Sequence, residues 1–290
     1  MAFRTRFAPS PTGPLHLGHA YSAILAHDMA QQHNGAFLLR IEDIDQSRAR
    51  REWEEQIYDD LTWLGLSWEN PVLHQADQLF RYRSVLSDLW RRGLLFPCNC
   101  SRRDIADALS APQEISAAVG PDGPVYPGTC RHLTNLQFEA ALPENRAIRL
   151  SIDEALEALE DQQEASFEEC LFEGGGIVKT DADELKNSIG DIVLARKDMG
   201  TSYHLAVVLD DAEQGITDVV RGEDLFEATK IHALLQRLLG LPTPRYHHHR
   251  LIRDEDGKRL AKRDDARALN KFRKEGYTPD DIRDLIGLAV

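Results

Sequence analysis

The sequence predicts an α/β protein built on a doubly wound, Rossmann-like parallel sheet, with helices on both faces of the sheet. Strands and helices alternate from the N-terminus to about residue 95, and the same alternation returns after about residue 186. The composition agrees, because 42% hydrophobic residues in a chain of 290 residues suffice for one large domain or two small ones. The sequence shows no internal repeat.

The first section alternates strands and helices in chain order. Residues 5–8 predict a short strand, residues 17–32 a helix rich in alanine and leucine, and residues 36–42 a second strand. Further helices are expected at residues 50–64 and 78–92. Four residues that break regular structure predict the turn between the first strand and the first helix: Pro9, Pro11, Gly13 and Pro14.

The rest of the chain divides by its regularity. An irregular stretch with all four cysteines precedes a second alternating section. In that section we expect strands at 189–196 and 202–212, a strand and turn at 216–225 and a helix at 229–239. We therefore predict four segments, namely the first half of the sheet domain at residues 1–95, an insertion at 96–185, the second half at 186–240 and a helical region at 241–290.

Two histidines, His16 and His19, stand where the first turn meets the first helix. Their spacing places both rings on one face of the first helical turn, where free backbone N–H groups and the helix dipole attract anions. Gly18 leaves room for a nucleotide against the backbone. An isolated H-x-x-H pattern is more often a pair of surface histidines, but the turn-rich residues before this pair favour a triphosphate site. The glycines at 174–176 lack the lysine spacing of a phosphate loop and predict a turn.

Three ordered segments resemble one enzyme family. They are RFAPSPTGPLHLGH at residues 6–19, LRIEDID at 39–45 and KRLAKR at 258–263. Together they resemble the class I aminoacyl-tRNA synthetases, and specifically the glutamyl branch. HLGH stands where that class carries its HIGH signature, and LAKR stands where it carries KMSKS.

The resemblance implies an ATP site and its catalytic residues. His16, Gly18, His19 and Lys262 would bind ATP, with Mg²⁺ bridging the phosphates, and the two histidines and the lysine would be catalytic. A lysine on a loop can reach the phosphates and offset the charge that builds up in the transition state. The loop departs from KMSKS, because Leu260 and Ala261 replace methionine and the first serine, and an exposed charged loop is the alternative interpretation.

An amino acid with an acidic side chain requires arginine for its carboxylates and a carboxylate for its ammonium group. Arg6 and Arg221 are candidates for the first role and Glu42 for the second. A structural salt bridge is the alternative for Glu42 and Arg221. The resemblance implies that the L-glutamate pocket is lined by Arg6, Phe7, Ala8, Pro9, Ser10, Glu42, Tyr203 and Arg221.

Three cysteines cluster in the predicted insertion and suggest one structural Zn²⁺ site. Cys98, Cys100 and Cys130 supply three of the four nitrogen or sulfur ligands that zinc prefers. His132 is the chemically ordinary fourth ligand, whereas the resemblance implies Tyr126, which precedes Cys130 by four residues. Both candidates stay open, and three unligated buried cysteines are the alternative.

The net charge of −14 is unusual for a protein that contacts nucleic acid, because phosphate contacts need lysine and arginine. The charge is segregated, however: residues 245–274 hold 11 Lys and Arg against 5 Asp and Glu. This basic segment suits a docked RNA, and a solvated basic face explains it equally well.

The acceptor is implied only by the resemblance. The chain resembles most closely the shortened glutamyl-type enzymes without an anticodon-binding domain, which transfer glutamate to the queuosine base of tRNA(Asp). Charging of tRNA(Glu), or a non-catalytic RNA-binding role, are the alternatives. The sequence has no long apolar run and no N-terminal signal pattern, so we expect a cytoplasmic protein without membrane contact. We also expect a monomer.

Overall fold

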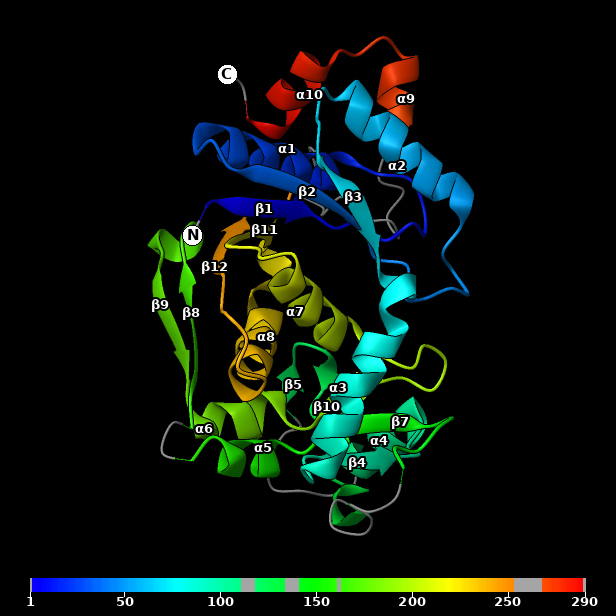
Figure 1. The fold of residues 1–290 in the computed structure, drawn as a ribbon, viewed down its shortest axis with the longest axis vertical. Helices are drawn as coiled ribbons and strands as arrows, with labels where there is room; N and C mark the ends of the chain where they lie inside the picture. The colour runs from blue at the N-terminus through cyan, green and yellow to red at the C-terminus, as the bar shows by residue number, and fades with distance from the viewer. Residues whose placement is uncertain (1, 111–117, 134–140, 161–162, 253–267, 289–290) are drawn as a thin grey trace.

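The computed structural model describes residues 2–110, 118–133, 141–160, 163–252 and 268–288 (Figure 1). The strands are β1 (Arg4–Phe7), β2 (Ala36–Ile41), β3 (Glu69–His74), β4 (Leu95–Cys98), β5 (Val119–Gly120), β6 (Gly123–Pro124), β7 (Ala147–Leu150), β8 (Ala165–Glu169), β9 (Gly176–Thr180), β10 (Ile192–Ala195), β11 (Asp218–Gly222) and β12 (Arg245–His249). The helices are α1 (Leu17–Gln32), α2 (Arg51–Trp63), α3 (Leu79–Arg91), α4 (Arg102–Ser110), α5 (Ile152–Ala158), α6 (Ala182–Glu184), α7 (Tyr203–Glu213), α8 (Phe226–Leu238), α9 (Leu269–Lys274) and α10 (Pro279–Ile286). Among the described helices, none has the length and apolar character needed to cross a bilayer.

Parallel strands form the centre of the molecule. β1, β2 and β3 pair in parallel, as do β11, β12 and β8, and β9 adds an antiparallel edge. β1 lies beside β11, because the Thr217 N–H donates to the Arg4 carbonyl (2.9 Å) and the Arg4 N–H donates to Thr217 Oγ1 (2.8 Å). The chain therefore winds outward in two directions from β1 and β11. Ligands of doubly wound sheets bind where the strand order reverses in this way, beyond the carboxyl ends of the strands.

Two hydrophobic clusters cover the two faces of this sheet. Leu38 packs into one cluster and Leu39 into the other, and Val219 and Val220 divide in the same way. Successive side chains of a strand point to opposite faces, so both β2 and β11 are covered on both sides. Figure 1 shows α1 and α2 on one side and α7 and α8 on the other. The predicted α/β fold with a parallel sheet is confirmed.

The second structural layer is an antiparallel sheet of β10, β7 and β4 in that order, with the short β5–β6 hairpin nearby. β10 comes from the predicted second half, yet it pairs with β7 of the predicted insertion. Conversely, β8 of the predicted insertion pairs with β12. Strand pairing thus crosses residue 185, and the four segment limits stay predictions.

The structure corrects two predictions of local structure. Residues 202–212 were expected as a strand but form α7, which Ser202 caps by accepting a hydrogen bond from the Leu205 N–H (3.4 Å). The run from His204 to Asp211 is buried on every side, so its sequence has no period that separates helix from strand. The region after residue 241, expected as helical, begins with strand β12 before α9 and α10. Gly174 and Gly175 lie in the turn between β8 and β9, as predicted, and Gly176 begins β9.

Candidate active site

A cleft of about 1130 Å³ opens at the carboxyl ends of β1 and β11, where the strand order reverses. Its wall also includes residues of the antiparallel sheet and of the β5–β6 hairpin. The structure brings nine of the residues predicted to bind glutamate or ATP to this cleft: Arg6, Phe7, Ala8, Pro9, Ser10, His19, Glu42, Tyr203 and Arg221. The Glu42 N–H donates to the Pro9 carbonyl (3.0 Å), which ties the turn after β1 to the end of β2.

His16 and His19 form the N-terminal cap of α1. His16 Nδ1 accepts from the Gly18 N–H (3.1 Å), and the His16 N–H donates to His19 Nδ1 (3.2 Å). The ring centroids are 3.8 Å apart. A Cβ on Gly18 would lie 3.1 Å from His16 Cε1, so only glycine leaves this ring undisturbed. The predicted pair thus shares one helical turn, with His19 facing the cleft.

The predicted catalytic Lys262, with the rest of the segment KRLAKR, lies outside the described residues. The residue after the undescribed range, Ala268, forms a β-bridge with His16, and the Leu269 N–H donates to the Leu15 carbonyl (2.8 Å). The chain that follows Lys262 by six residues therefore meets the start of α1.

A cluster of buried charges lies under one wall of the cleft. Arg6 donates to both carboxylate oxygens of Asp211 (2.9 and 3.3 Å), and Arg40 Nη1 donates to Asp211 Oδ1 (2.7 Å). Arg81 pairs with Asp210, which Arg40 also approaches. The Arg6 charge is therefore matched by a buried carboxylate, although Arg6 also lines the cleft.

Glu42 and Tyr203 share this charged environment. Burial raises the pKa of Glu42, and the charges of Arg40 and Arg6 oppose the rise. Burial also raises the pKa of Tyr203, while Arg221 lowers it and Glu42 raises it. Tyr203, Arg221 and Glu42 all line the cleft, so its wall presents both a cation and an acid.

Arg221 differs from Arg6 in its partners. Its Nε–H donates to His248 Nε2 (3.1 Å), Nη1 donates to His232 Nδ1 (3.1 Å), and Nη2 donates to Thr229 Oγ1. Arg221 is 5% exposed, and its guanidinium forms no ion pair with a carboxylate of the described residues. It is a buried cation held by neutral groups.

The residues that support these charges were not predicted from the sequence. Asp211 and Arg40 belong to the buried ion cluster, and His232 and His248 hold Arg221. Two signals were present in the sequence: charged residues directly adjoin apolar runs in VVLDD and LLRIE, and three histidines follow one another at residues 247–249. Charge next to a fully apolar run predicts a buried, paired ion.

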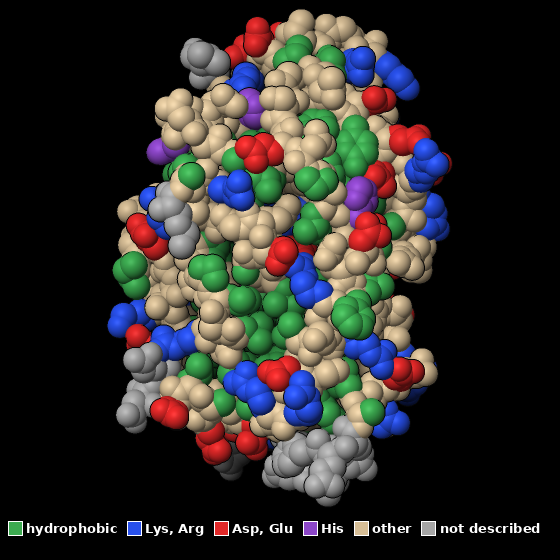
Figure 2. Space-filling view, viewed as in Figure 1, with side chains coloured by type: hydrophobic (Ala, Val, Ile, Leu, Met, Phe, Trp, Pro, Cys, Tyr) green, Lys and Arg blue, Asp and Glu red, His purple; other side chains and the backbone are tan. Residues whose placement is uncertain are grey.

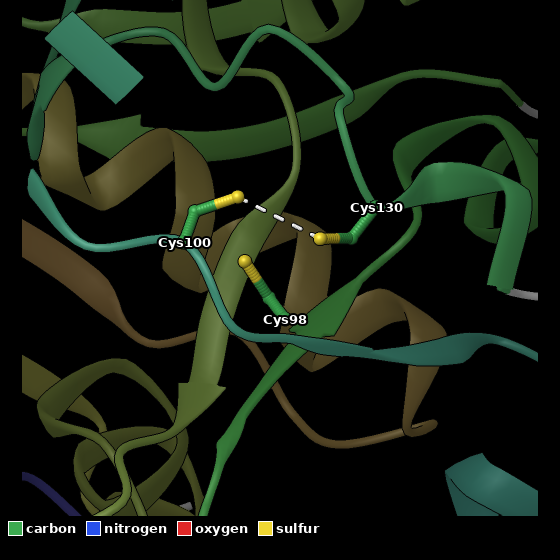
Figure 3. Close-up of side chains that lie close together, drawn as sticks. All are labelled: Cys98, Cys100 and Cys130. Carbon is green, nitrogen blue, oxygen red and sulfur yellow. Dashed lines mark hydrogen bonds between the residues drawn. The ribbon is translucent and has the colours of Figure 1, made fainter. Parts of the chain in front are cut away.

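The three predicted cysteines lie together, and one of them, Cys100, lines the cleft (Figure 3). The Sγ atoms of Cys98, Cys100 and Cys130 lie within 4.8 Å of one another, and those of Cys100 and Cys130 are 3.6 Å apart. Three thiols at this separation fit a tetrahedral metal ion with one further ligand. The structure thus contains a cluster of three cysteines that could hold a metal.

The two candidates for the fourth ligand differ in position. Tyr126 Oη lies 3.5 Å from Sγ of both Cys98 and Cys100 and accepts a hydrogen bond from the Cys130 N–H (2.8 Å). Burial strongly raises the pKa of the Tyr126 hydroxyl, and the nearby cysteines raise it further. His132 is exposed and is not part of the cluster of metal-binding side chains found among the described residues. The geometry therefore favours Tyr126.

Comparison with known proteins decides the family. Residues 2–289 match the family model of the catalytic domain of class I tRNA synthetases (E and Q). The chain belongs to this family. The resemblance inferred from the sequence is confirmed, and the match runs through the predicted insertion as well as both halves of the sheet.

Similar proteins carry names from this family. One relative, from Rhodobacter capsulatus, is named glutamyl-Q tRNA(Asp) synthetase and is 61% identical over 98% of this chain and 99% of its own length. Another, from Aquifex aeolicus, is named glutamate–tRNA ligase and is 36% identical over 96% of this chain but only 55% of its own length. A crystal structure of a glutamate–tRNA synthetase from Elizabethkingia anophelis superimposes with a TM-score of 0.74, covering 99% of this chain and 61% of that one. At 22% identity, this match shows the fold alone.

Proposed function

We propose that the chain activates L-glutamate with ATP and transfers the glutamyl group to the queuosine base of tRNA(Asp). The observation that carries the glutamate site is Arg221, a buried guanidinium without a carboxylate partner among the described residues, in the same cleft as Glu42. A buried cation held by neutral groups is suited to an anionic ligand. The name of the relative at 61% identity supports the acceptor.

In the proposed complex, Arg221 binds a carboxylate of glutamate and Glu42 binds its ammonium group, in the cleft that Tyr203 also lines. Arg6 lines the same cleft but is already paired with Asp211, so its share in binding a second carboxylate is smaller than that of Arg221. Glutamine would lose a charge-assisted hydrogen bond to arginine, worth about 1.5–3 kcal/mol, and should be a poor substrate.

The proposed chemistry has two steps. The α-carboxylate of glutamate attacks the α-phosphorus of ATP, and pyrophosphate leaves from that phosphorus. His16, His19 and Lys262 stabilise the negative charge that develops on the phosphates, and Mg²⁺ bound with ATP neutralises part of it. An RNA hydroxyl then attacks the glutamyl carbonyl and releases AMP. No side chain need act as a nucleophile, because the adenylate is already activated.

We further propose that Cys98, Cys100, Cys130 and Tyr126 hold one structural zinc ion. Cys100 and Tyr126 also line the cleft, so the metal would fix the wall opposite β1.

On the face shown in Figure 2, Lys and Arg side chains are interspersed with Asp and Glu side chains. If RNA contacts this face, the contact would depend on local groups of basic residues.

Two assays test the proposal in sequence. ATP–pyrophosphate exchange should require glutamate, should not respond to glutamine and should proceed without tRNA. Labelled glutamate should then appear on tRNA(Asp) that carries queuosine and not on tRNA(Asp) without this base. Transfer to tRNA(Glu) alone would replace the proposed acceptor, and an absence of exchange at saturating glutamate would refute the catalytic role.

A further inference from the structure

A chain of hydrogen bonds runs from Arg221 toward the β5–β6 hairpin. Arg221 Nη1 can only donate, so His232 Nδ1 accepts (3.1 Å). A neutral His232 then carries its proton on Nε2 and donates to His204 Nδ1 (3.0 Å). His204 in turn donates from Nε2 to the carboxylate of Asp122, with both oxygens at 3.0 Å. Burial and the charge of Arg221 lower the pKa of His232 well below its usual range, which keeps this ring neutral.

A second chain runs from Arg221 in the opposite direction. The Arg221 Nε–H donates to His248 Nε2 (3.1 Å), so His248 carries its proton on Nδ1 and donates to Glu169 Oε2 (2.5 Å). The other oxygen of Glu169 accepts from the N–H groups of Leu171 (2.9 Å) and Phe172 (2.8 Å). Burial raises the pKa of Glu169, but the bonds from His248 and the two N–H groups outweigh it and lower the pKa to about 2. Glu169 therefore stays ionised at neutral pH.

In both chains of hydrogen bonds, each donor lies on the side of Arg221 and each acceptor on the far side. Each chain passes through neutral imidazoles and ends at a carboxylate that does not contact the guanidinium. Arg221 keeps its full charge, and its orientation is fixed by three of its five N–H groups, which leaves two without a partner among the described residues. A carboxylate in direct contact, as Asp211 is with Arg6, would compete with an anionic ligand.

We propose that His204, His232 and His248 are positioning residues that orient Arg221 for a substrate carboxylate while leaving its charge uncompensated. The proposal deepens the proposed function, because it assumes that Arg221 binds a carboxylate of glutamate. It assigns a role to buried histidines on α7, α8 and β12, which the proposed chemistry does not use. It also connects the carboxylate-binding residue to Asp122 on the β5–β6 hairpin.

The first test measures the tautomers directly and needs no activity. Long-range ¹H–¹⁵N correlation spectra of the ¹⁵N-histidine-labelled full chain distinguish neutral rings protonated on Nδ1 from those protonated on Nε2. We expect His248 to carry its proton on Nδ1 and His204 and His232 on Nε2, with signals assigned by single substitutions. A charged imidazolium at His232, or the opposite tautomer at His248, would overturn the proposal.

The second test uses amide side chains that keep one bond of each ring. At position 232, Arg221 contacts Nδ1, so asparagine retains an acceptor near this atom and glutamine does not. At position 248, Arg221 contacts Nε2, so glutamine retains the acceptor and asparagine does not. We expect His232→Gln and His248→Asn to raise the KM for glutamate in exchange about tenfold, with little change in kcat or in the KM for ATP. His232→Asn and His248→Gln should stay within about threefold of the unchanged protein.

The control is His33→Asn, because His33 is exposed and lies outside the cleft. If a histidine has only a structural role, both substitutions at its position should change the KM for glutamate equally. That result would overturn the proposal. The two tests also separate it from the proposed function. If the tautomers are as expected but no glutamate-dependent exchange occurs, the glutamate site is refuted. If exchange is normal but asparagine and glutamine have the same effect on the KM for glutamate at each position, only the positioning role is refuted.

Discussion

Replacing Asp211 with asparagine tests the buried ion cluster beneath the cleft. Asp211 accepts from Arg6 at 2.9 and 3.3 Å and from Arg40 at 2.7 Å, and both arginines are buried. Asp211→Asn preserves the size of the side chain but leaves two guanidinium groups with one carboxylate fewer. Removing one partner of a buried ion pair costs about 3–5 kcal/mol of unfolding free energy.

The assay is thermal and urea unfolding followed by circular dichroism. At roughly 2–4 °C per kcal/mol for a chain of this size, the melting temperature should fall by about 6 °C or more. Asp88→Asn is the matched control, because Asp88 pairs with Arg91 at 3.4 Å on the exposed surface of α3 and should change stability by less than about 0.5 kcal/mol. A loss in Asp211→Asn as small as in this control would refute the reasoning.

The pH dependence of stability tests the interaction of Asp211 independently. Although burial raises the pKa of Asp211, the charges of Arg6 and Arg40 outweigh it and hold the pKa below its usual range. The stabilisation is therefore present above the unfolded-state pKa of about 3.9 and is lost as the pH falls through the lower folded-state pKa. The difference in stability between the unchanged protein and Asp211→Asn should shrink below about pH 4.

Three further substitutions test the proposed sites. Glu42→Gln should raise the KM for glutamate in pyrophosphate exchange about tenfold or more, because the ammonium group loses its charged partner. Gly18→Ala should raise the KM for ATP several-fold and cost about 1 kcal/mol, because the new Cβ would meet the capping ring of His16 at 3.1 Å. Cys130→Ser should reduce bound zinc from about one equivalent per chain to well below that, measured by metal analysis.

Each of these has a control and a contradicting result. Glu69→Gln changes an exposed glutamate on β3 and should leave the KM for glutamate unchanged. If Glu42→Gln and Glu69→Gln have equal effects, Glu42 does not bind the ammonium group. The KM for glutamate is the internal control for Gly18→Ala, since an unchanged KM for ATP would count against the cap as a phosphate site. For zinc, His132→Ala should keep the metal, and its loss there would return His132 to the ligand set.

Sequence patterns predicted several elements well. α1 spans the predicted residues 17–32, because prolines and a glycine end the preceding strand and no residue within the helix breaks it. α7 was predicted wrongly, because an apolar run buried on all sides has the same appearance as helix or strand. Its helical form matters for the site, since it carries Tyr203, His204 and Asp211 on one element.

The sequence by itself predicted the family resemblance and the short motifs in and beside the cleft: the turn at residues 6–10, the histidine pair and the cysteine pattern. Only the tertiary structure decided which charges cancel. Asp211 meets Arg6 across 205 residues of chain, and Glu169 meets His248 across 79. Such pairings follow from the order of parallel strands, which brings distant segments together, whereas local patterns extend over only a few residues. Arg6 and Arg221 look equivalent in the sequence. The fold pairs Arg6 with Asp211 and leaves Arg221 without a carboxylate partner among the described residues.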